Sequence, residues 1–352
     1  MKKLISILLA SILCVSLVAC ANNSTSNDSD APAETGNSSE AATDTKVLRM
    51  AFNQAEAHPQ YQAMLKFSEN FKAATDGRYD IQLFPNETLG NQRETLEQIQ
   101  AGALDMSIVN NTHPGSLSDY YKTFDLPFVF ESVEEAMGFL TSDNDVVAEV
   151  KQSVEQHGVH IASYFPAGTR SMYTAKAEVH SVADMAGMKI RTMESDVYIK
   201  MMEYFGGNAT PMAMGELYTA IQSGVVDGAE NNEITYVNSK HYEVAPYWSQ
   251  TNHLIVPDWL IINLDLYNSF SPEDKAAFDE QCQIAAKEVN VLWDAEVEKL
   301  MATLDTSKVT ITTDVDVESF RDAVLPLHDE LTSQNADIKK VYDALQEYRK
   351  SN

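Results

Sequence analysis

Cysteine is scarce in this sequence: its 352 residues include three, Cys14, Cys20 and Cys282. Cys14 and Cys20 belong to an apolar N-terminal segment, so the body of the chain contains only Cys282. A fold stabilised by a disulfide within that body is therefore excluded. Cys282 lies in a stretch with helical periodicity, which indicates a buried thiol rather than a reactive one.

Motifs of catalysis and cofactor binding are absent. The sequence contains no G-x-G-x-x-G, no P-loop, no G-x-S-x-G, no H-E-x-x-H and no EF-hand loop. Its eight histidines are dispersed, and none of them pair at metal-ligand spacing. We therefore expect no catalytic residue, no metal and no cofactor, and we predict that the chain is not an enzyme.

Basic residues are few. The chain has 25 lysines and arginines against 52 aspartates and glutamates, which gives a formal net charge of −27. A chain this acidic disfavours binding to nucleic acid and to anionic lipid, and its charge mostly signifies solubility. An arginine held in a cleft is then more informative, because the overall field does not attract anions.

Long hydrophobic runs are confined to the N-terminus. Residues 1–20 comprise two lysines, an apolar run over 4–19 and Cys20, which is typical of a secretory signal. The ending LVAC resembles a bacterial lipobox, in which the cysteine is lipidated; the alternative is an ordinary signal peptide with an incidental cysteine. Residues 21–45 are rich in small polar residues and should form a flexible tether. We expect an exported chain anchored through Cys20 to the outer face of the cytoplasmic membrane.

The pattern of residues 187–232 reads strand, helix, strand, helix, strand. The same pattern occurs earlier, and both copies contain a similar segment: IQAGALD at 99–105 and IQSGVVD at 221–227. Such units can resemble one another in any α/β protein, but the shared flanking order favours two lobes. We predict a two-lobed α/β fold like that of periplasmic binding proteins, with a βαβαβ-based sheet flanked by helices in each lobe. Ligands of open α/β sheets bind outside the carboxyl ends of the strands.

The chain beyond the tether is long enough for about two domains. We predict that lobe I comprises residues 46–167 and about 257–296, and that lobe II comprises 168–256 and about 297–352. A strand over 259–264 would return the chain to lobe I. A long helix beginning at Ser271-Pro272 and reaching about residue 304 has no interior glycine or proline, and it can cross both lobes.

Two arginines lie at predicted strand ends. Arg191 ends the first strand of the second unit, and Arg170 ends the loop after a strand over 159–164. A guanidinium presents a planar fork that matches a carboxylate with two parallel hydrogen bonds. Either arginine could instead form a surface or interlobe salt bridge. Because Arg191 and Asn231 belong to neighbouring strand ends of one unit, we favour a carboxylate-binding site.

Four motifs point to a family. They are AGTR at 167–170, MKIR at 188–191, PMAMGELY at 211–218 and VDGAEN at 226–231. With them, residues 46–340 closely resemble the solute receptors of tripartite ATP-independent periplasmic (TRAP) transporters. In that family the arginine at the position of Arg191 makes a bidentate salt bridge to the ligand carboxylate, which the arginine at Arg170 supports. The asparagine at Asn231 hydrogen-bonds the ligand. The residue at Met214 lines the pocket and is often aromatic, so methionine is a departure that weakens any stacking role.

The resemblance also implies a mechanism and partners. The two lobes close on the ligand, and the closed receptor docks on an integral-membrane permease that uses an ion gradient. Since the transporter supplies the energy, the receptor needs no catalytic group. We expect a monomer that binds a small organic acid.

The rest of the ligand is expected to contact polar residues of the first lobe: His58, Gln92, Asn110 and Asn111. Neutral amides and an imidazole suit hydroxyls better than a second carboxylate, and the stretch around Glu194 resembles members that take sugar acids. We predict a hexuronate such as glucuronate or galacturonate, or a related sugar acid. A C4-dicarboxylate is the alternative, and it would need a second cation in the pocket. Neither Arg93 nor Lys122 obviously supplies one.

Three other classes of protein remain open. An exported hydrolase or lyase acting on a sugar acid would need a carboxylate pair near Arg191, for which Glu194 with Glu230 is the only candidate. A surface adhesin or structural lipoprotein would show no closure on a ligand. The receptor of an ATP-driven importer shares the two lobes, but the motifs around Arg191 argue against it.

Overall fold

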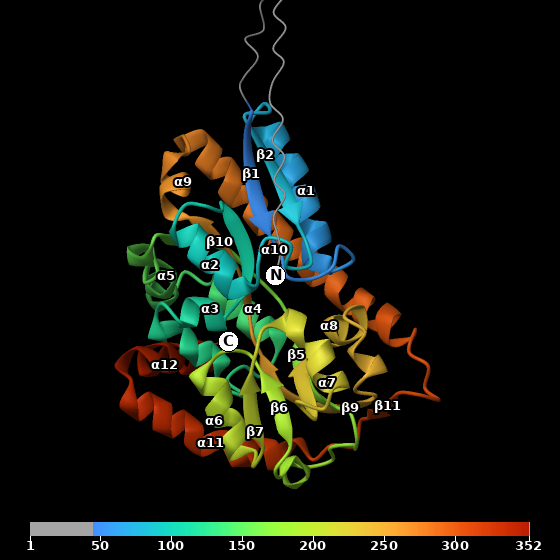
Figure 1. Cartoon of the computed structure of the whole chain (residues 1–352). Helices are drawn as coiled ribbons and strands as arrows, with labels where there is room; N and C mark the ends of the chain where they lie inside the picture. Colours follow the sequence, from blue (N-terminus) through green and yellow to red (C-terminus); the bar gives the residue numbers. More distant parts are fainter. Residues whose placement is uncertain (1–44, 352) are drawn as a thin grey trace, which may run out of the picture. The chain divides into compact units, whose positions relative to one another are not determined.

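Two β-sheets organise residues 45–351, which are the residues that the computed structural model describes (Figure 1). The predicted signal, Cys20 and nearly all of the tether lie outside these residues. The five-stranded sheet has the order β2-β1-β3-β10-β4, and the six-stranded sheet has the order β11-β9-β5-β8-β6-β7. Helices flank both sheets (Figure 1). The predicted α/β fold class is confirmed.

The strands are short, and each has a place in one of the two sheets. In the five-stranded sheet they are β1 (Lys46–Ala51), β2 (Tyr79–Phe84), β3 (Met106–Asn110), β4 (Val159–Phe165) and β10 (Asp258–Asn263). In the six-stranded sheet they are β5 (Thr169–Thr174), β6 (Lys189–Thr192), β7 (Asn208–Pro211), β8 (Gly228–Asn231), β9 (Tyr247–Ile255) and β11 (Thr310–Thr312).

The helices alternate with the strands in the first two thirds of the chain and dominate its end. The α-helices are α1 (Pro59–Ala74), α2 (Gln92–Gln100), α3 (Thr112–Gly115), α4 (Val133–Thr141), α5 (Asp145–Gln152), α6 (Asp196–Tyr204), α7 (Leu217–Gln222), α8 (Glu233–Asn238), α9 (Leu264–Ser269), α10 (Pro272–Met301), α11 (Val317–Gln334) and α12 (Ala336–Ser351). The 3-10 helices are η1 (Asp119–Asp125), η2 (Glu155–His157), η3 (Val182–Met185), η4 (Met214–Glu216) and η5 (His241–Glu243).

The two similar sequence units form the same arrangement of strands and helices in the structure. The unit β1-α1-β2-α2-β3 forms parallel strands in the order β2-β1-β3, and the unit β6-α6-β7-α7-β8 forms them in the order β7-β6-β8. The second helix of each unit is followed by a glycine in the left-handed region, Gly102 at φ +68° and Gly224 at φ +73°. This conformation suits glycine, and it closes a helix C-terminus before the next strand begins.

The last strand of the second unit begins later than the sequence pattern indicates. The pattern predicts a strand over 225–229, whereas β8 is Gly228–Asn231. The backbone N–H groups of Val225 and Val226 donate to the carbonyl of Ala220, so these residues complete the end of α7. The predicted helix over 214–223 is likewise divided into η4 and α7.

The chain crosses between the two sheets three times, and its last crossing leads from β10 through α9 and α10 to β11. It passes from β4 to β5 and later returns from β9 to β10, which confirms the predicted returning strand. The long helix α10 begins as predicted, since Ser271 caps it by accepting a hydrogen bond from the N–H of Asp274 at 3.0 Å. It packs against α1 and β4 and also against α8, so it spans elements associated with both sheets. The exact lobe boundaries stay a prediction.

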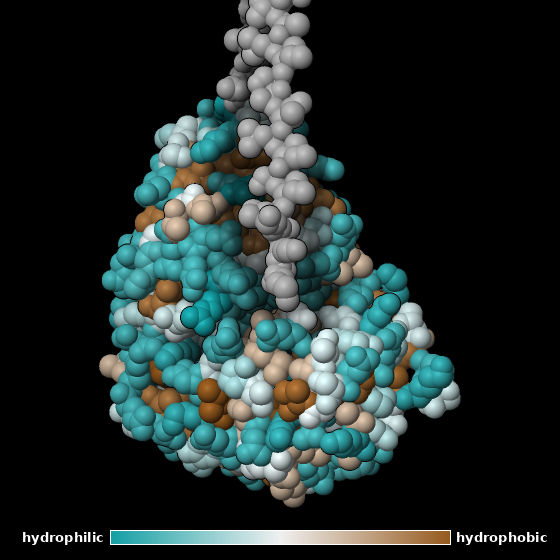
Figure 2. Space-filling model, viewed as in Figure 1, coloured by the Kyte–Doolittle hydropathy of each residue, from teal (hydrophilic) through white to brown (hydrophobic). Residues whose placement is uncertain are grey.

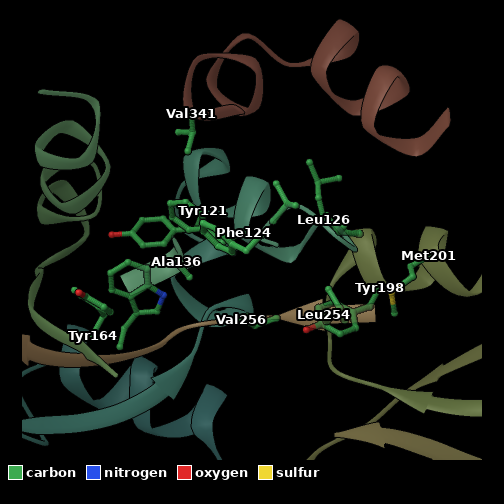
Figure 3. Packing of buried hydrophobic residues seen from close by; sticks show 14 of the residues in the cluster. Tyr121, Phe124, Leu126, Ala136, Tyr164, Tyr198, Met201, Leu254, Val256 and Val341 are labelled. Atoms are coloured by element: carbon green, nitrogen blue, oxygen red, sulfur yellow. The ribbon is translucent and has the colours of Figure 1, made fainter. Parts of the chain in front are cut away.

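One buried cluster reaches from one sheet to the other (Figure 3). It joins Tyr164 of β4 to Leu254 of β9 and Tyr198 of α6. Tyr121 and Phe124, from the aromatic stretch that contains η1, are fully buried within it. The core is therefore continuous behind the crossings, and it holds the site-bearing strands in place.

The surface agrees with the acidic composition. The visible face of the described residues is mostly hydrophilic, with apolar residues in small separate areas (Figure 2). Within residues 45–351, no helix has the length and apolar character needed to cross a bilayer. Cys282 is 1% exposed, which confirms that this thiol is buried.

Candidate ligand-binding cleft

A cleft lined from both sheets contains about 660 Å³ of empty space. Eight of the nine residues predicted to bind ligand line it: His58, Gln92, Asn110, Arg170, Arg191, Glu194, Met214 and Asn231. Residues separated by up to 173 positions in the sequence are thereby brought together. Their contact with a ligand stays a prediction.

Three of these residues belong to neighbouring strands of the six-stranded sheet. Arg191 is the third residue of β6, Asn231 is the last of β8, and Arg170 is the second of β5. Because β5, β8 and β6 are neighbours in the sheet, their backbone pairing keeps all three residues extended. The prediction placed Arg170 at the end of a loop, whereas the structure places it in β5; all three residues line the same cleft.

Arg191 is a buried cation without an acidic partner. Its side chain donates from Nε and Nη2 to the carbonyl oxygen of Met212, at 3.0 and 2.7 Å. The residue is 3% exposed, and within residues 45–351 it forms no salt bridge. Burial lowers the pKa of its guanidinium. A buried charge is unfavourable unless it is paired, so the cleft is suited to an anionic ligand at this point.

Arg170, in contrast, is fully paired. It donates from Nε and Nη2 to the two carboxylate oxygens of Glu230, at 2.6 and 2.9 Å, and from Nη1 to Oδ1 of Asn231 at 3.0 Å. Burial opposes its charge, but the Glu230 carboxylate raises the pKa of Arg170 overall. Since this pair is neutral as a whole, the uncompensated positive charge of the site belongs to Arg191.

Asn231 is oriented by its neighbours. Its Oδ1 accepts from Arg170 and also from the backbone N–H of Asn232 at 2.9 Å. An amide oxygen held by two donors leaves the Nδ2 group on the other side of the amide, and none of the residues 45–351 accepts from it. Asn231 can therefore donate a hydrogen bond into the cleft.

The wall formed by the five-stranded sheet carries neutral polar groups. His58 caps α1, with its Nδ1 accepting from the N–H of Gln60 at 3.3 Å. Burial lowers the pKa of His58 to about 3, so the ring is neutral at pH 7 and its Nε2 carries the proton. Oδ1 of Asn110 accepts from the N–H of Thr112 at 3.3 Å, and its Nδ2 donates to Asp258 at 3.1 Å. Such groups suit ligand hydroxyls.

The remaining predicted residues lie at the edge of the cleft. Gln92 is the first residue of α2, and its Oε1 accepts from the N–H of Asn110 at 3.4 Å. Glu194 has a half-exposed side chain, 4.0 Å from the guanidinium of Arg93. Met214 begins η4 and packs against the core beside it. The structure does not bring Asn111 into the cleft, because it is fully buried and bonded to Asp125 and Trp259.

The cleft also contains residues that the sequence patterns did not single out. Among them are Glu87, His113 and Asp258. Of the two cations that the sequence did not mark as obvious ligand contacts, Arg93 lines the cleft and Lys122 does not. The Arg93 side chain is 66% exposed and lies 3.4 Å from Glu97. His113 is neutral, since burial and the two nearby arginines lower its pKa to about 4. His113 follows Asn110, the last residue of β3, by three positions, and this closeness to a strand end could have indicated from the sequence that it belongs to the site.

Comparison with known proteins identifies the family. A family model described as bacterial extracellular solute-binding protein, family 7 (DctP) matches residues 50–335. The chain belongs to this family. A solute-binding protein from Chromohalobacter salexigens is 31% identical, over 83% of this chain and 86% of its own length.

Solved structures of TRAP periplasmic solute-binding proteins are also similar to this family 7 member. One from Anaerococcus prevotii, with bound α/β-D-glucuronate, is 32% identical with a TM-score of 0.83, over 87% of this chain and 99% of that chain. One from a Bradyrhizobium species, in complex with α/β-D-galacturonate, is 30% identical with a TM-score of 0.82, over 86% and 100%. The predicted class, a TRAP-type solute-binding protein, is confirmed, and at the level of the family the chain is an extracellular binding protein and not an enzyme.

Proposed function

We propose that this family 7 protein captures a hexuronate, glucuronate or galacturonate, or a related sugar acid, and delivers it to an ion-gradient-driven permease. The observation that carries the proposal is Arg191, a buried guanidinium in the cleft that forms no salt bridge within residues 45–351. A ligand carboxylate would supply the missing charge through two parallel hydrogen bonds. The donor groups of Asn231 and His58 would then meet the rest of the ligand.

The alternatives have weaker support. A C4-dicarboxylate would place its second carboxylate opposite Arg93, but that side chain is largely exposed and already beside Glu97 and Glu194. An exported lyase or hydrolase would use Glu194 with Glu230. Glu230 is 0% exposed and both of its carboxylate oxygens accept from Arg170, so it is poorly placed to act as a base.

Closure of two lobes on the ligand is part of the proposal. Contacts outside the cleft already join the two predicted lobes: Ser195 at the start of α6 donates to Asp125 at 3.2 Å, and Lys122 donates to Asp196 at 2.9 Å. We place these pairs on opposite lobes, with the boundaries predicted above. The closed form would present the surface that the permease recognises.

Thermal unfolding of the purified mature chain against a panel of acids tests the ligand class. A ligand at about one hundred times its Kd adds roughly 2.7 kcal/mol to the free energy of unfolding, which a melting curve resolves. We expect glucuronate and galacturonate to raise the Tm, and succinate, malate, gluconate and sialic acid to raise it less or not at all. A shift with the dicarboxylates alone would overturn the hexuronate assignment. No shift with any acid, after refolding to remove a co-purified ligand, would overturn the carboxylate site itself.

The N-terminal anchor is a separate part of the proposal. The LVAC sequence ending at Cys20 supports lipidation of that cysteine and attachment to the outer face of the cytoplasmic membrane. Cells fed a clickable fatty acid should label the wild-type protein but not Cys20→Ser, and the variant should no longer remain with membranes through a lipid. Equal labelling of the two proteins, or no labelling of the wild type, would refute the anchor.

A further inference from the structure

Two acidic side chains line the cleft without a cationic partner. Within residues 45–351, neither Asp258 nor Glu87 forms a salt bridge, although Arg191 and Arg170 line the same cleft. Burial raises the pKa of both carboxyl groups. The rise is partly offset by their hydrogen bonds and by the charges of the nearby arginines, Arg191 for Glu87 and Arg170 for Asp258. Two carboxylates without a salt bridge are unfavourable in a site that binds an anion, unless they form hydrogen bonds with the ligand.

Asp258 is held firmly in one orientation. It is the first residue of β10, directly after the chain crosses between the sheets. Its Oδ2 accepts from Nε2 of Gln60 at 2.9 Å, and its Oδ1 accepts from Nδ2 of Asn110 at 3.1 Å. Each carboxylate oxygen can accept more than one hydrogen bond, so acceptor capacity remains toward the cleft.

Glu87 reaches the cleft from a constrained turn after β2. Both Asn86 and Glu87 have φ +55°, an uncommon conformation for residues other than glycine. The carboxylate lies against Gly215 on the opposite side of the cleft, where a Cβ would come within 2.6 Å of Oε2 of Glu87. Backbone strain of this kind persists where the surrounding structure requires it, and it gathers at ligand-binding sites.

We propose that Asp258 and Glu87 determine which acids the cleft accepts: they receive hydrogen bonds from ligand hydroxyls and exclude a ligand with a second carboxylate. The inference rests on the proposed function. An ionised carboxylate is only an acceptor, so it pairs with a hydroxyl and repels another anion. Specificity of this type depends on the repulsive contact as much as on the attractive one.

A matched pair of ligands isolates the effect. A hexuronate and the corresponding hexarate, such as glucuronate and glucarate, have the same six-carbon skeleton, and the hexarate has a second carboxylate at the other end. Both can present one carboxylate to Arg191. Only the hexarate must bring a second negative charge toward the two acids. Because glucuronate can close to a ring and glucarate cannot, the change in the ratio of the two Kd values when an acid is replaced reports the role of that acid.

Calorimetric titration of the mature chain with both ligands tests the proposal. The wild type should bind glucuronate at least about a hundredfold more tightly than glucarate, as expected for an unpaired like charge in a buried site. Asp258→Asn and Glu87→Gln should each weaken glucuronate binding about tenfold or more. Each substitution should also bring the ratio of the glucarate Kd to the glucuronate Kd at least about tenfold closer to unity. The double variant should bring this ratio closer still.

Asp279→Asn is the matched control. Asp279 is also an acid whose pKa burial raises, but it bonds to Tyr267 outside the cleft, so both Kd values should stay at wild-type levels. If Asp258 or Glu87 had a purely structural role, its replacement would weaken the binding of both ligands equally and leave the ratio of their Kd values unchanged. That result would overturn the inference. If one variant does not fold, the other decides the outcome. Failure of the wild type to bind glucuronate would instead refute the proposed function.

Discussion

Replacing Arg191 by alanine should weaken hexuronate binding by about 3–5 kcal/mol, or on the order of two to four factors of ten in Kd. The reason is the charge arrangement of the cleft. Arg170 is neutralised by Glu230 at 2.6 Å, so Arg191 is the buried charge that remains for the ligand carboxylate. Without it, that carboxylate would be desolvated with no partner.

Calorimetric titration of the variant with glucuronate measures this loss directly. Arg191→Lys keeps the positive charge but replaces the planar fork, so it should also bind much more weakly than the wild type. Arg321→Ala is a suitable control, since Arg321 lies outside the cleft, pairs with Glu318 and lies over the ring of Phe128. Binding that survives in Arg191→Ala within a few-fold would show that the carboxylate is held elsewhere.

Replacing Glu230 by alanine should lower the free energy of unfolding of the ligand-free protein by about 3–5 kcal/mol. Glu230 is 0% exposed and accepts two hydrogen bonds from Arg170, which is itself 3% exposed. Its removal leaves a buried guanidinium with the Asn231 oxygen and a backbone carbonyl as its remaining acceptors. The loss therefore follows from an uncompensated charge rather than from the net strength of the ion pair.

Urea unfolding of the ligand-free chain, followed by circular dichroism, measures this effect. Glu230→Gln retains an acceptor and the side-chain volume, so it should be less destabilising than Glu230→Ala. Asp343→Ala removes one member of an exposed ion pair with Lys339, for which we expect a change within about 0.5 kcal/mol. If Glu230→Ala were no more destabilising than Asp343→Ala, the buried pair would have no structural importance.

The two arginines thus have different expected signatures. Loss of the Arg191 guanidinium should affect affinity far more than ligand-free stability, because no acid within residues 45–351 forms a salt bridge with it. Disruption of the Arg170–Glu230 pair should affect stability first. It should affect affinity as well, because Arg170 holds Asn231 in its orientation.

Several parts of the molecule were predictable from local patterns. The similar segments at 99–105 and 221–227 indicated a repeated unit, and both copies form parallel strands in the same relative order. Ser271-Pro272 indicated the start of a long helix, and α10 begins there. These predictions succeeded because helix capping, glycine at a helix end and hydrophobic periodicity act between residues that are close in sequence. The family motifs named Arg191, Arg170 and Asn231, which line one cleft.

Other features depended on residues that are far apart in sequence. Glu230 was predicted as a polar residue after a strand, but its pairing with Arg170 follows from β5 and β8 lying side by side. Arg93 appeared to be an ordinary residue at a helix start, and only the approach of the two sides of the cleft places it beside Glu194.

The sequence by itself determined the two repeated units, the class of protein and Arg191 as the arginine whose guanidinium could bind a carboxylate. Tertiary structure alone decided which charges are neutralised, which remain for a ligand, and that Asp258 and Glu87 join the site. The physical reason is that charge balance and burial depend on every group within a few ångströms, whichever part of the chain supplies it. Periodicity and motifs report only on neighbours along the chain.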